Sequence, residues 1–294
     1  MLSVIIPSRN ERFLVQTIAD LLKNATGDIE VVAVLDGYEQ DLPEDRRVHS
    51  VHSPTVMGMR KAINEGVKFA SGDYVMKLDG HCSVAYRFDE ILTENIEDNW
   101  VVVPRRYSLD AENWQVQPKR PVRDYHYLCY PDPNKKHDGG MHGVEWPERT
   151  KERQPPQYDI DDTPCLQGSC WMMSRKHWDK IGGLYEGKIY GTSGMAGEPV
   201  EICLKTWLSG GSVKVNKRTW YAHLHKGKAY GRGYSIDDKT LIPGQNAVAR
   251  YWVNDEWPGA TRKFEWLVDE KFPDMPTWFP GWQQQLRRDG VIHD

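Results

Sequence analysis

Short apolar runs alternate with longer amphipathic segments in the first 105 residues. The apolar runs have the length and β-branched content of buried strands, and they lie at Leu2–Ile6, Glu30–Leu35, Tyr74–Leu78 and Trp100–Val103. Apolar residues recur at helical spacing in the segments Arg12–Lys23 and Val56–Ala70. Strands that alternate with helices are typical of βαβ units, so we expect a largely parallel sheet covered by helices.

The regular pattern stops at about Arg106 and resumes near Leu166. Pro, Gly, Asp, Lys and Tyr occur between these points without a sustained period, which predicts an irregular insertion. The elements expected beyond it, in chain order, are a strand in Leu166–Met173, a helix near Arg175–Ile181, a Gly-rich loop at Gly182–Gly197, a helix at Glu198–Leu208, two strands at Val213–Val215 and Thr219–Leu224, and a helix at Asn246–Val253.

Composition narrows the class of protein. The chain has 294 residues, 39% hydrophobic and 27% charged, which excludes collagen-like, coiled-coil and wholly disordered proteins. A net charge of −4 excludes a generally basic nucleic-acid coat, although seven Lys or Arg and no Asp or Glu lie between Cys203 and Ile236. Five cysteines without a CxxC pair predict free thiols. The sequence has neither a signal peptide nor an apolar spanning segment, so we expect a cytoplasmic protein without a membrane anchor.

A carboxylate and an imidazole follow the strand Tyr74–Leu78. Asp79 and His81 come directly after this apolar run, at the end of a strand where ligands bind in open α/β sheets. Two residues apart, they can face one cation, although an Asp-x-His pair on its own is a weak signal of a metal site.

Several segments together are more specific than this pair. Four segments of the first half resemble the nucleotide-sugar half of the GT-A glycosyltransferases. They are Val4-Ile5-Ile6-Pro7-Ser8-Arg9-Asn10-Glu11, the strand ending in Leu35-Asp36-Gly37, the step Gly58-Met59-Arg60, and Leu78-Asp79-Gly80-His81. His81 followed by Cys82 looks most like the polypeptide N-acetylgalactosaminyltransferases. Leu166-Gln167-Gly168-Ser169-Cys170-Trp171 and Gly197-Glu198-Pro199-Val200-Glu201 resemble the second half of that family, so the resemblance spans roughly residues 2 to 232.

The resemblance implies a fold and a division of the chain. It implies the GT-A fold, a three-layer α/β/α sandwich with a mixed central sheet and a C-terminal extension. Residues 1–240 would be the catalytic domain, with a nucleotide-binding half at 1–105, an irregular acceptor-side insertion at 106–165 and an acceptor and lid half at 166–240. Residues 241–294, with five Trp, would pack on that domain through aromatic contacts, with a stacking platform for carbohydrate or a base as the alternative.

The resemblance also assigns a metal site. It implies that Asp79 and His81 bind Mn²⁺ or Mg²⁺, together with a third ligand from the segment Ala222-His223-Leu224-His225. Alternation along a strand puts both histidines on the same side, so the spacing does not choose between them. Comparison with the family favours His223, and His225 is the reserve.

For the donor, Asp36 resembles the carboxylate that accepts a hydrogen bond from the uracil imide, and Pro7 and Arg9 resemble residues beside uracil and ribose. Arg60 would reach the nucleotide phosphates or brace Asp79, although it could also be a solvated helix charge. The other residues that the resemblance assigns to the donor are Glu11, Asp79, Gly80, Gly168, Ser169 and Trp171.

Three residues have implied catalytic roles. Lys226 and Arg232 lie in a Gly-rich segment that resembles the family's lid, where they would neutralise the departing diphosphate. Glu198 occupies the position of a substrate-positioning Glu in retaining members, and inversion with Glu198 as the general base is the alternative. A first-turn Glu that favours the helix dipole would also explain its position.

These patterns predict a metal-dependent glycosyltransferase that moves a hexose or N-acetylhexosamine from a UDP-sugar to a hydroxyl, with retention. The acceptor would be a protein Ser or Thr, a glycan, or a hydroxymethylated base in DNA. Two other classes remain as alternatives. A nucleotidyltransferase would need a Gly-rich loop after the first strand, which Pro7-Ser8-Arg9-Asn10-Glu11 is not. A module that binds nucleotide or carbohydrate without catalysis would keep the fold and transfer nothing.

Overall fold

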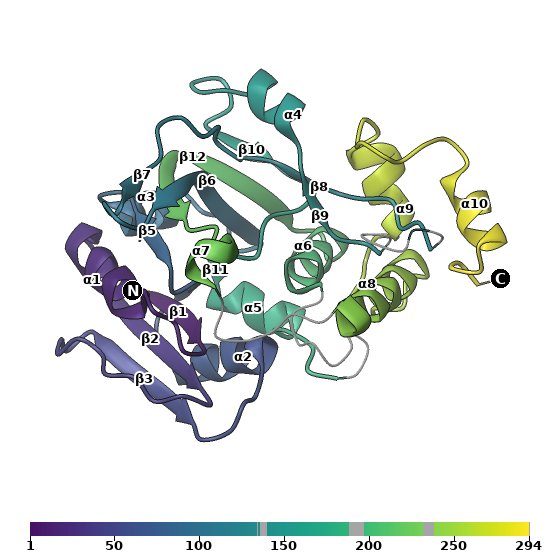
Figure 1. Ribbon diagram of the computed structural model, residues 1–294. Coiled ribbons are helices and arrows are strands. Elements are labelled where there is room, and N and C mark those ends of the chain that lie inside the picture. The colour runs from purple at the N-terminus through teal and green to yellow at the C-terminus, as the bar shows by residue number, and fades with distance from the viewer. Residues whose placement is uncertain (134, 136–139, 188–196, 232–237, 294) are drawn as a thin grey trace.

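One mixed β-sheet forms the centre of the molecule (Figure 1). The computed structural model describes residues 1–133, 135, 140–187, 197–231 and 238–293. Within those residues the sheet has ten strands in the order β10-β12-β6-β11-β4-β1-β2-β3, with β5 paired to β12 and β7 to β6. The strands are β1 (Leu2–Ser8), β2 (Ile29–Asp36), β3 (Val48–Ser53), β4 (Tyr74–Leu78), β5 (Cys82–Val84), β6 (Trp100–Asp110), β7 (Gln115–Val116), β10 (Ile160–Asp162), β11 (Cys170–Ser174) and β12 (Ser212–His223). A separate hairpin pairs β8 (His126–Leu128) with β9 (Gly143–Glu145).

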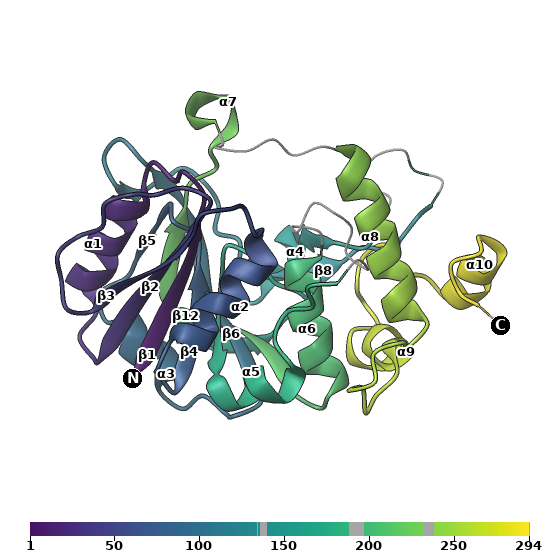
Figure 2. The same ribbon diagram turned by 90° about the horizontal axis from the view of Figure 1, so that it is seen from below.

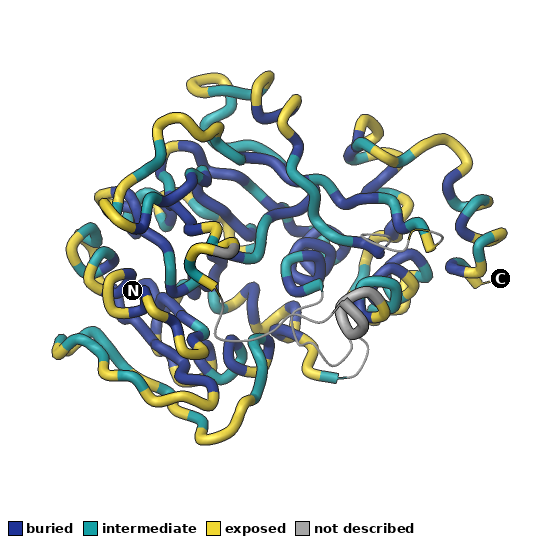
Figure 3. Tube along the Cα trace, in the orientation of Figure 1, coloured by how far each residue is buried: buried dark blue, intermediate teal, exposed yellow. Residues whose placement is uncertain are grey.

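The parallel part of the sheet is buried on both faces. β1 pairs with β2 on one side and with β4 on the other, so that Ile5 lies opposite both Val32 and Lys77. Nearly every residue of β1 and β2 is buried (Figure 3), which explains their continuous apolar sequences. Lys77, inside β4, is a buried charged residue in an otherwise apolar strand.

Helices cover both faces of the sheet. On one face, α1 (Leu14–Asn24) packs with β5 and α3 (Phe88–Thr93), where Asp89 accepts hydrogen bonds from the backbone N–H groups of Thr26 and Gly27. On the other, α2 (Met59–Phe69) is joined to α6 (Glu198–Leu208) by a buried ion pair between Arg60 and Glu201, and α5 (Arg175–Ile181) lies beside them (Figure 2). The expected α/β/α architecture is therefore observed.

The sheet is mixed, as the resemblance implied, because β11 runs antiparallel to both β4 and β6. Two other expectations about secondary structure need correction. The two closing strands are one strand, β12, with an irregular register between Asn216 and Trp220. The insertion at 106–165 is not irregular throughout, because it contains the end of β6, the strands β7 to β10 and the helix α4 (Pro147–Glu152).

The C-terminal segment packs on the main domain through aromatic side chains. Its elements are α8 (Asp238–Val253), α9 (Phe264–Trp266), a π-helical turn (Leu267–Lys271) and α10 (Trp282–Arg288). Trp266 lies 6.4 Å, centroid to centroid, from the buried Trp207 of α6, and the Trp278 indole donates to the carbonyl of Leu128. These contacts pack Trp266 and Trp278 on the main domain, and the expected boundary after residue 240 falls inside α8.

The five cysteines are buried and free, in agreement with the expected thiols. Among the described helices, none has the length and apolar character needed to cross a bilayer.

Candidate active site

Three loop and strand ends bring Asp79, His81 and His223 together. Asp79 follows β4, His81 precedes β5, and His223 is the last residue of β12. Because β12 pairs with β5 so that His223 lies opposite Cys82, the two imidazoles are 4.8 Å apart, centroid to centroid. His223 Nε2 lies 3.2 Å and His81 Nε2 3.8 Å from Asp79 Oδ2, and one donor atom from each residue lies within 4.8 Å of the others.

The Asp79 carboxylate is held by a buried lysine. Lys77 lies two positions earlier on the same face of β4, and its Nζ contacts Asp79 Oδ1 and the carbonyl oxygen of Gly168. Burial would raise the pKa of Asp79, but the charge of Lys77 and the contacts with His223 and His81 hold it well below its usual value. Asp79 is therefore a carboxylate, with Oδ2 directed at the two imidazoles.

Glu11 orients His81 from the other side. Glu11 Oε2 lies 3.0 Å from His81 Nδ1 and also accepts a hydrogen bond from Lys226 Nζ. Burial opposes ionisation, yet the hydrogen bonds and charges of His81 and Lys226 lower the pKa of Glu11. A carboxylate on Nδ1 directs Nε2 of His81 toward Asp79, an arrangement common behind metal-binding histidines.

His223 and His225 have different surroundings. His223 is buried, and burial lowers its pKa to about 3 despite the contact with Asp79. The His225 ring contacts two arginines, because its Nε2 lies 2.5 Å from Arg106 Nη2 and 2.6 Å from Arg123 Nη1. Burial and these two charges lower the pKa of His225 to about 4. The clustered set contains His223, and His225 lies outside it.

Glu198 is the first residue of α6 and is only 1% exposed. The indole N–H of Trp171 donates to its Oε1 at 2.5 Å. This hydrogen bond and the charge of Lys77 both favour a lower pKa for Glu198. Burial outweighs these contacts and raises the pKa of Glu198. Gly168 lies against the same carboxyl, because a Cβ there would collide with Glu198 Oε2.

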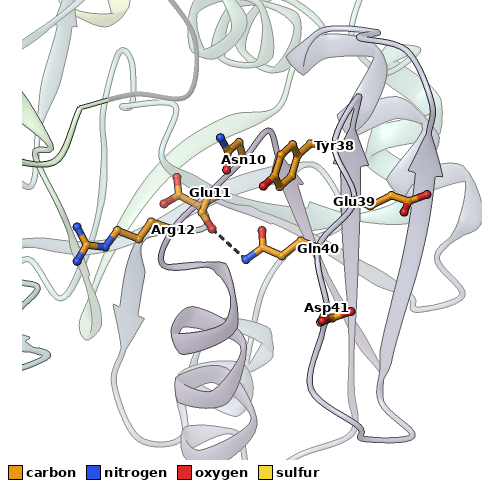
Figure 4. Close-up of a pocket in the computed structure, with 7 residues that line it drawn as sticks. All are labelled: Asn10, Glu11, Arg12, Tyr38, Glu39, Gln40 and Asp41. Atoms are coloured by element: carbon orange, nitrogen blue, oxygen red, sulfur yellow. Dashed lines mark hydrogen bonds between the residues drawn. The ribbon is translucent and has the colours of Figure 1, made fainter.

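A pocket of about 320 Å³ lies beside the triad, at the carboxyl ends of β1 and β2 (Figure 4). Its lining residues are Asn10, Glu11, Arg12, Tyr38, Glu39, Gln40 and Asp41. Gln40 donates to the carbonyl of Glu11, while Arg12 points away from the other lining side chains (Figure 4). Asp36 ends β2 close by, but its carboxylate accepts hydrogen bonds from the backbone N–H groups of Met57 and Gly58.

The remaining expected donor residues lie around this centre. Pro7 is half-buried at the end of β1, and Arg9 is exposed in the loop that follows. Gly80 packs so closely on Glu11 that a Cβ would lie 2.9 Å from its Cγ. Ser169 and Trp171 are buried, and the Ser169 hydroxyl lies 2.8 Å from the hydroxyl of Tyr221. Their roles in donor binding stay predictions.

Two expected side chains need separate comment. Arg60 does not brace Asp79, since its guanidinium pairs with the buried Glu201 and the lysine at position 77 takes that place. A role at the phosphates stays a prediction for Arg60. Arg232 lies outside the described residues.

Sequence reasoning missed Lys77, Arg106 and Arg123. Lys77 left a signal, because it is the only charged residue in an otherwise apolar strand, Tyr74–Leu78. Arg106 and Arg123 lie in the part of the chain that showed no period, and their convergence on His225 depends on the pairing of β6 with β12.

Comparison with known proteins identifies the sequence family of the chain. The model of the family described as "Glycosyl transferase family 2" matches residues 3–182. Putative polypeptide N-acetylgalactosaminyltransferase 13 of Drosophila melanogaster is 27% identical over 86% of the chain and 48% of its own length. Human polypeptide N-acetylgalactosaminyltransferase 3 is 23% identical over 86% of the chain and 41% of its own length. The chain thus spans about half the length of these curated relatives.

Solved structures show the same fold. The crystal structure of GalNAc-T7 with UDP, GalNAc and Mn²⁺ superposes with a TM-score of 0.70. The match covers 95% of this chain and 58% of the other at 17% identity. The expected GT-A architecture is confirmed by this likeness.

Proposed function

The chain belongs to glycosyltransferase family 2, and from that premise we propose that it transfers a hexose or N-acetylhexosamine from a UDP-sugar to an acceptor hydroxyl. The observation that carries the proposal is the convergence of Asp79, His81 and His223 within 4.8 Å of one another, next to the pocket at β1 and β2. The UDP and Mn²⁺ named for the GalNAc-T7 structure support the same donor chemistry.

The donor atoms fit a divalent cation. One carboxylate oxygen and two imidazole nitrogens suit Mn²⁺ better than Mg²⁺, which prefers oxygen ligands. Asp79 is ionised, and Glu11 directs the Nε2 of His81 toward the site. A cation held there would supply positive charge to the diphosphate of the donor.

We assign the remaining steps to side chains of this chain. The nucleoside would lie in the pocket beside Asn10 and Tyr38, with Pro7, Arg9 and Asp36 nearby. The Lys226 ammonium, now on Glu11, and Arg232 would neutralise the departing diphosphate. Gly168, Ser169 and Trp171 would border the sugar, with Arg60 behind the phosphates.

Retention is the stereochemical outcome that we propose. A general base for inversion must reach the acceptor hydroxyl, and a carboxyl that is 1% exposed and bonded to Trp171 is badly placed for that role. Glu198 then acts by holding Trp171 and the loop at Gly168. For the acceptor, the names of the relatives favour a protein Ser or Thr over a glycan or a modified DNA base.

The test is calorimetric titration of UDP with Mn²⁺, with a chelator, and with Asp79→Ala. We expect binding only with Mn²⁺ and only while Asp79 is present. Asp73→Ala is the matched control, because Asp73 is an exposed carboxylate paired with the N-terminus. Metal-independent binding, or equal binding by Asp79→Ala, would sink the proposed site. Incubation with UDP-sugars then separates a transferase from a binding module, since only the former releases UDP.

A further inference from the structure

A buried arginine without a carboxylate partner lies beside the metal-ligand candidates. Arg106, in the middle of β6, is 4% exposed, and its Nε has no hydrogen-bond partner in the described part of the chain. Its Nη2 donates to His225 Nε2 and lies 3.5 Å from His223 Nδ1. No carboxylate oxygen of a described residue lies within 4.0 Å of this guanidinium. A guanidinium buried without an anion is unfavourable, so this position suits a negatively charged ligand.

The neighbouring arginine shows what a paired guanidinium looks like here. Arg105 points to the opposite face of the same strand, where Asp124 accepts hydrogen bonds of 3.0 Å and 2.7 Å from its Nε and Nη2. Arg106 therefore lacks a carboxylate partner among the residues that the structure describes, whereas its neighbour Arg105 on the same strand has one.

Positive charge accumulates around Arg106. Arg123 donates to the same His225 nitrogen at 2.6 Å, and Arg120 lies near enough to influence the charge of that ring. Against them stands one carboxylate, Glu145, which is 3.0 Å from Arg123 Nε. Arg106 and Arg123, with Arg120 nearby, have one carboxylate of a described residue beside them, which leaves a surplus of positive charge for an anion to balance.

The basic stretch of the sequence is a different feature. Three of its side chains form ion pairs with acidic residues from elsewhere in the fold, namely Lys205 with Glu201, Lys214 with Asp162, and Arg218 with Glu94. Unlike these three residues, Arg106 has no carboxylate partner in the described part of the chain, and it meets Arg123 at His225. We call Arg106, Arg123 and His225 the arginine cluster, and it is too compact to follow a polymer of phosphates.

The arginine cluster lies on the acceptor side of the triad. The sheet order places β6 and β12 on one side of β4 and the nucleoside pocket at β1 and β2 on the other. An anion bound to Arg106 and Arg123 would thus lie across the metal ligands from the nucleoside.

We propose that the arginine cluster binds a phosphomonoester group of the acceptor, next to the hydroxyl that receives the sugar. This proposal rests on the proposed function for the identity of the reaction, whereas the anion site stands on Arg106, Arg123 and His225. Arginine forks pair with phosphate oxygens through two parallel hydrogen bonds, which fixes the orientation of the group as well as its position.

The experiment titrates methyl phosphate by calorimetry into protein already saturated with Mn²⁺ and UDP, so that the donor site is filled. We expect one site per chain, and we expect Arg123→Gln and Arg106→Met each to weaken it by about tenfold or more. Arg218→Gln, which removes a paired arginine from β12, is the matched control and should bind as the parent does. Dimethyl phosphate, a monoanion like a nucleic-acid phosphodiester, should bind at least about tenfold more weakly than methyl phosphate.

Several outcomes would overturn the proposal. Equal binding by the parent and both variants, equal binding of dimethyl phosphate, or competition between methyl phosphate and UDP each contradicts it. Arg106→Met removes a buried side chain, and this variant could fail to fold. In that case Arg123→Gln provides the result, because the Arg123 side chain is partly exposed. Failure of the donor site is recognised separately, because UDP binding is measured first in the same samples.

Discussion

The ammonium of Lys77 contacts the half-buried carboxylate of Asp79 and lies close enough to the buried Glu198 to oppose the raised pKa of that residue. Burial lowers the pKa of a lysine, yet here the charges of Asp79 and Glu198 raise it. The lysine therefore remains an ammonium, and it allows the Asp79 carboxylate, a candidate metal ligand, and the buried Glu198 to lie near the same loop at Gly168.

Replacement of this lysine should expose the repulsion that it suppresses. We expect Lys77→Met to lower the free energy of unfolding by about 3–5 kcal/mol, because it leaves buried carboxyl groups without their counter-ion. Urea denaturation measures the loss. Adding Glu198→Gln to Lys77→Met should recover part of it, and a double variant that is no more stable than Lys77→Met would contradict this account.

The two histidines at the end of β12 should differ in metal binding. His223→Ala removes one of three candidate ligands within 4.8 Å of one another, and we expect it to weaken Mn²⁺ binding by about tenfold or more. His225→Ala should cost much less, because its ring faces Arg106 and Arg123. Electron paramagnetic resonance of free Mn²⁺ gives both affinities. A larger loss for His225→Ala would transfer the third ligand to that residue.

A methyl group at position 168 should disturb the same loop. The Cβ of Gly168→Ala would collide with Glu198 Oε2, and overpacking of this kind costs about 1–3 kcal/mol. Thermal or urea denaturation of Gly168→Ala tests this. In the background of Glu198→Ala the same substitution should cost less, since the colliding carboxyl is absent. Equal costs in the two backgrounds would show that the strain lies elsewhere.

A buried histidine outside the site should make stability depend on pH. His177 contacts Thr206 Oγ1 through Nε2, and burial lowers its pKa to about 4 from 6.5. Between these values the unfolded chain binds a proton that the folded chain does not, so stability falls as the pH drops from 6.5 toward 4. The difference amounts to about 3 kcal/mol at the low end.

Comparison with His177→Gln isolates this contribution. The difference in unfolding free energy between parent and variant, measured in urea from pH 7 to pH 4.5, should shrink as the pH falls. A difference that stays constant over this range would show that His177 does not titrate with folding.

The strands and helices of the first 105 residues could be predicted because buried elements have continuous or periodic apolar sequences. β3 (Val48–Ser53) was missed because it lies at the edge of the sheet, where its sequence repeats Val-His-Ser and has no continuous apolar run. The division of β12 was wrong because Asn216 to Trp220 is polar enough to indicate a turn, whereas the chain continues through it with a shift in register.

Within the candidate site, residues marked by the local sequence could be predicted, whereas contacts between distant segments could not. Asp79 and His81 follow a recognisable strand, so their position could be predicted. Which histidine of Ala222-His223-Leu224-His225 faces them depends on the pairing of β12 with β5, and neighbouring Arg106 attracts the other ring. Lys77 and Glu198 are distant in sequence, and only the packing of α6 against the sheet brings their charges together.

The aromatic packing of the C-terminal segment has a consequence for biosynthesis. Trp207 of α6 is covered by Trp266 and Phe272, and the backbone N–H groups of Thr261 and Arg262 donate to the carbonyl of Leu208. A nascent chain that has emerged from the ribosome only to residue 240 therefore holds a completed sheet with the apolar side of α6 still in water. We expect this apolar surface to be open to chaperones until the segment that carries Trp266 and Phe272 has emerged and packed on α6.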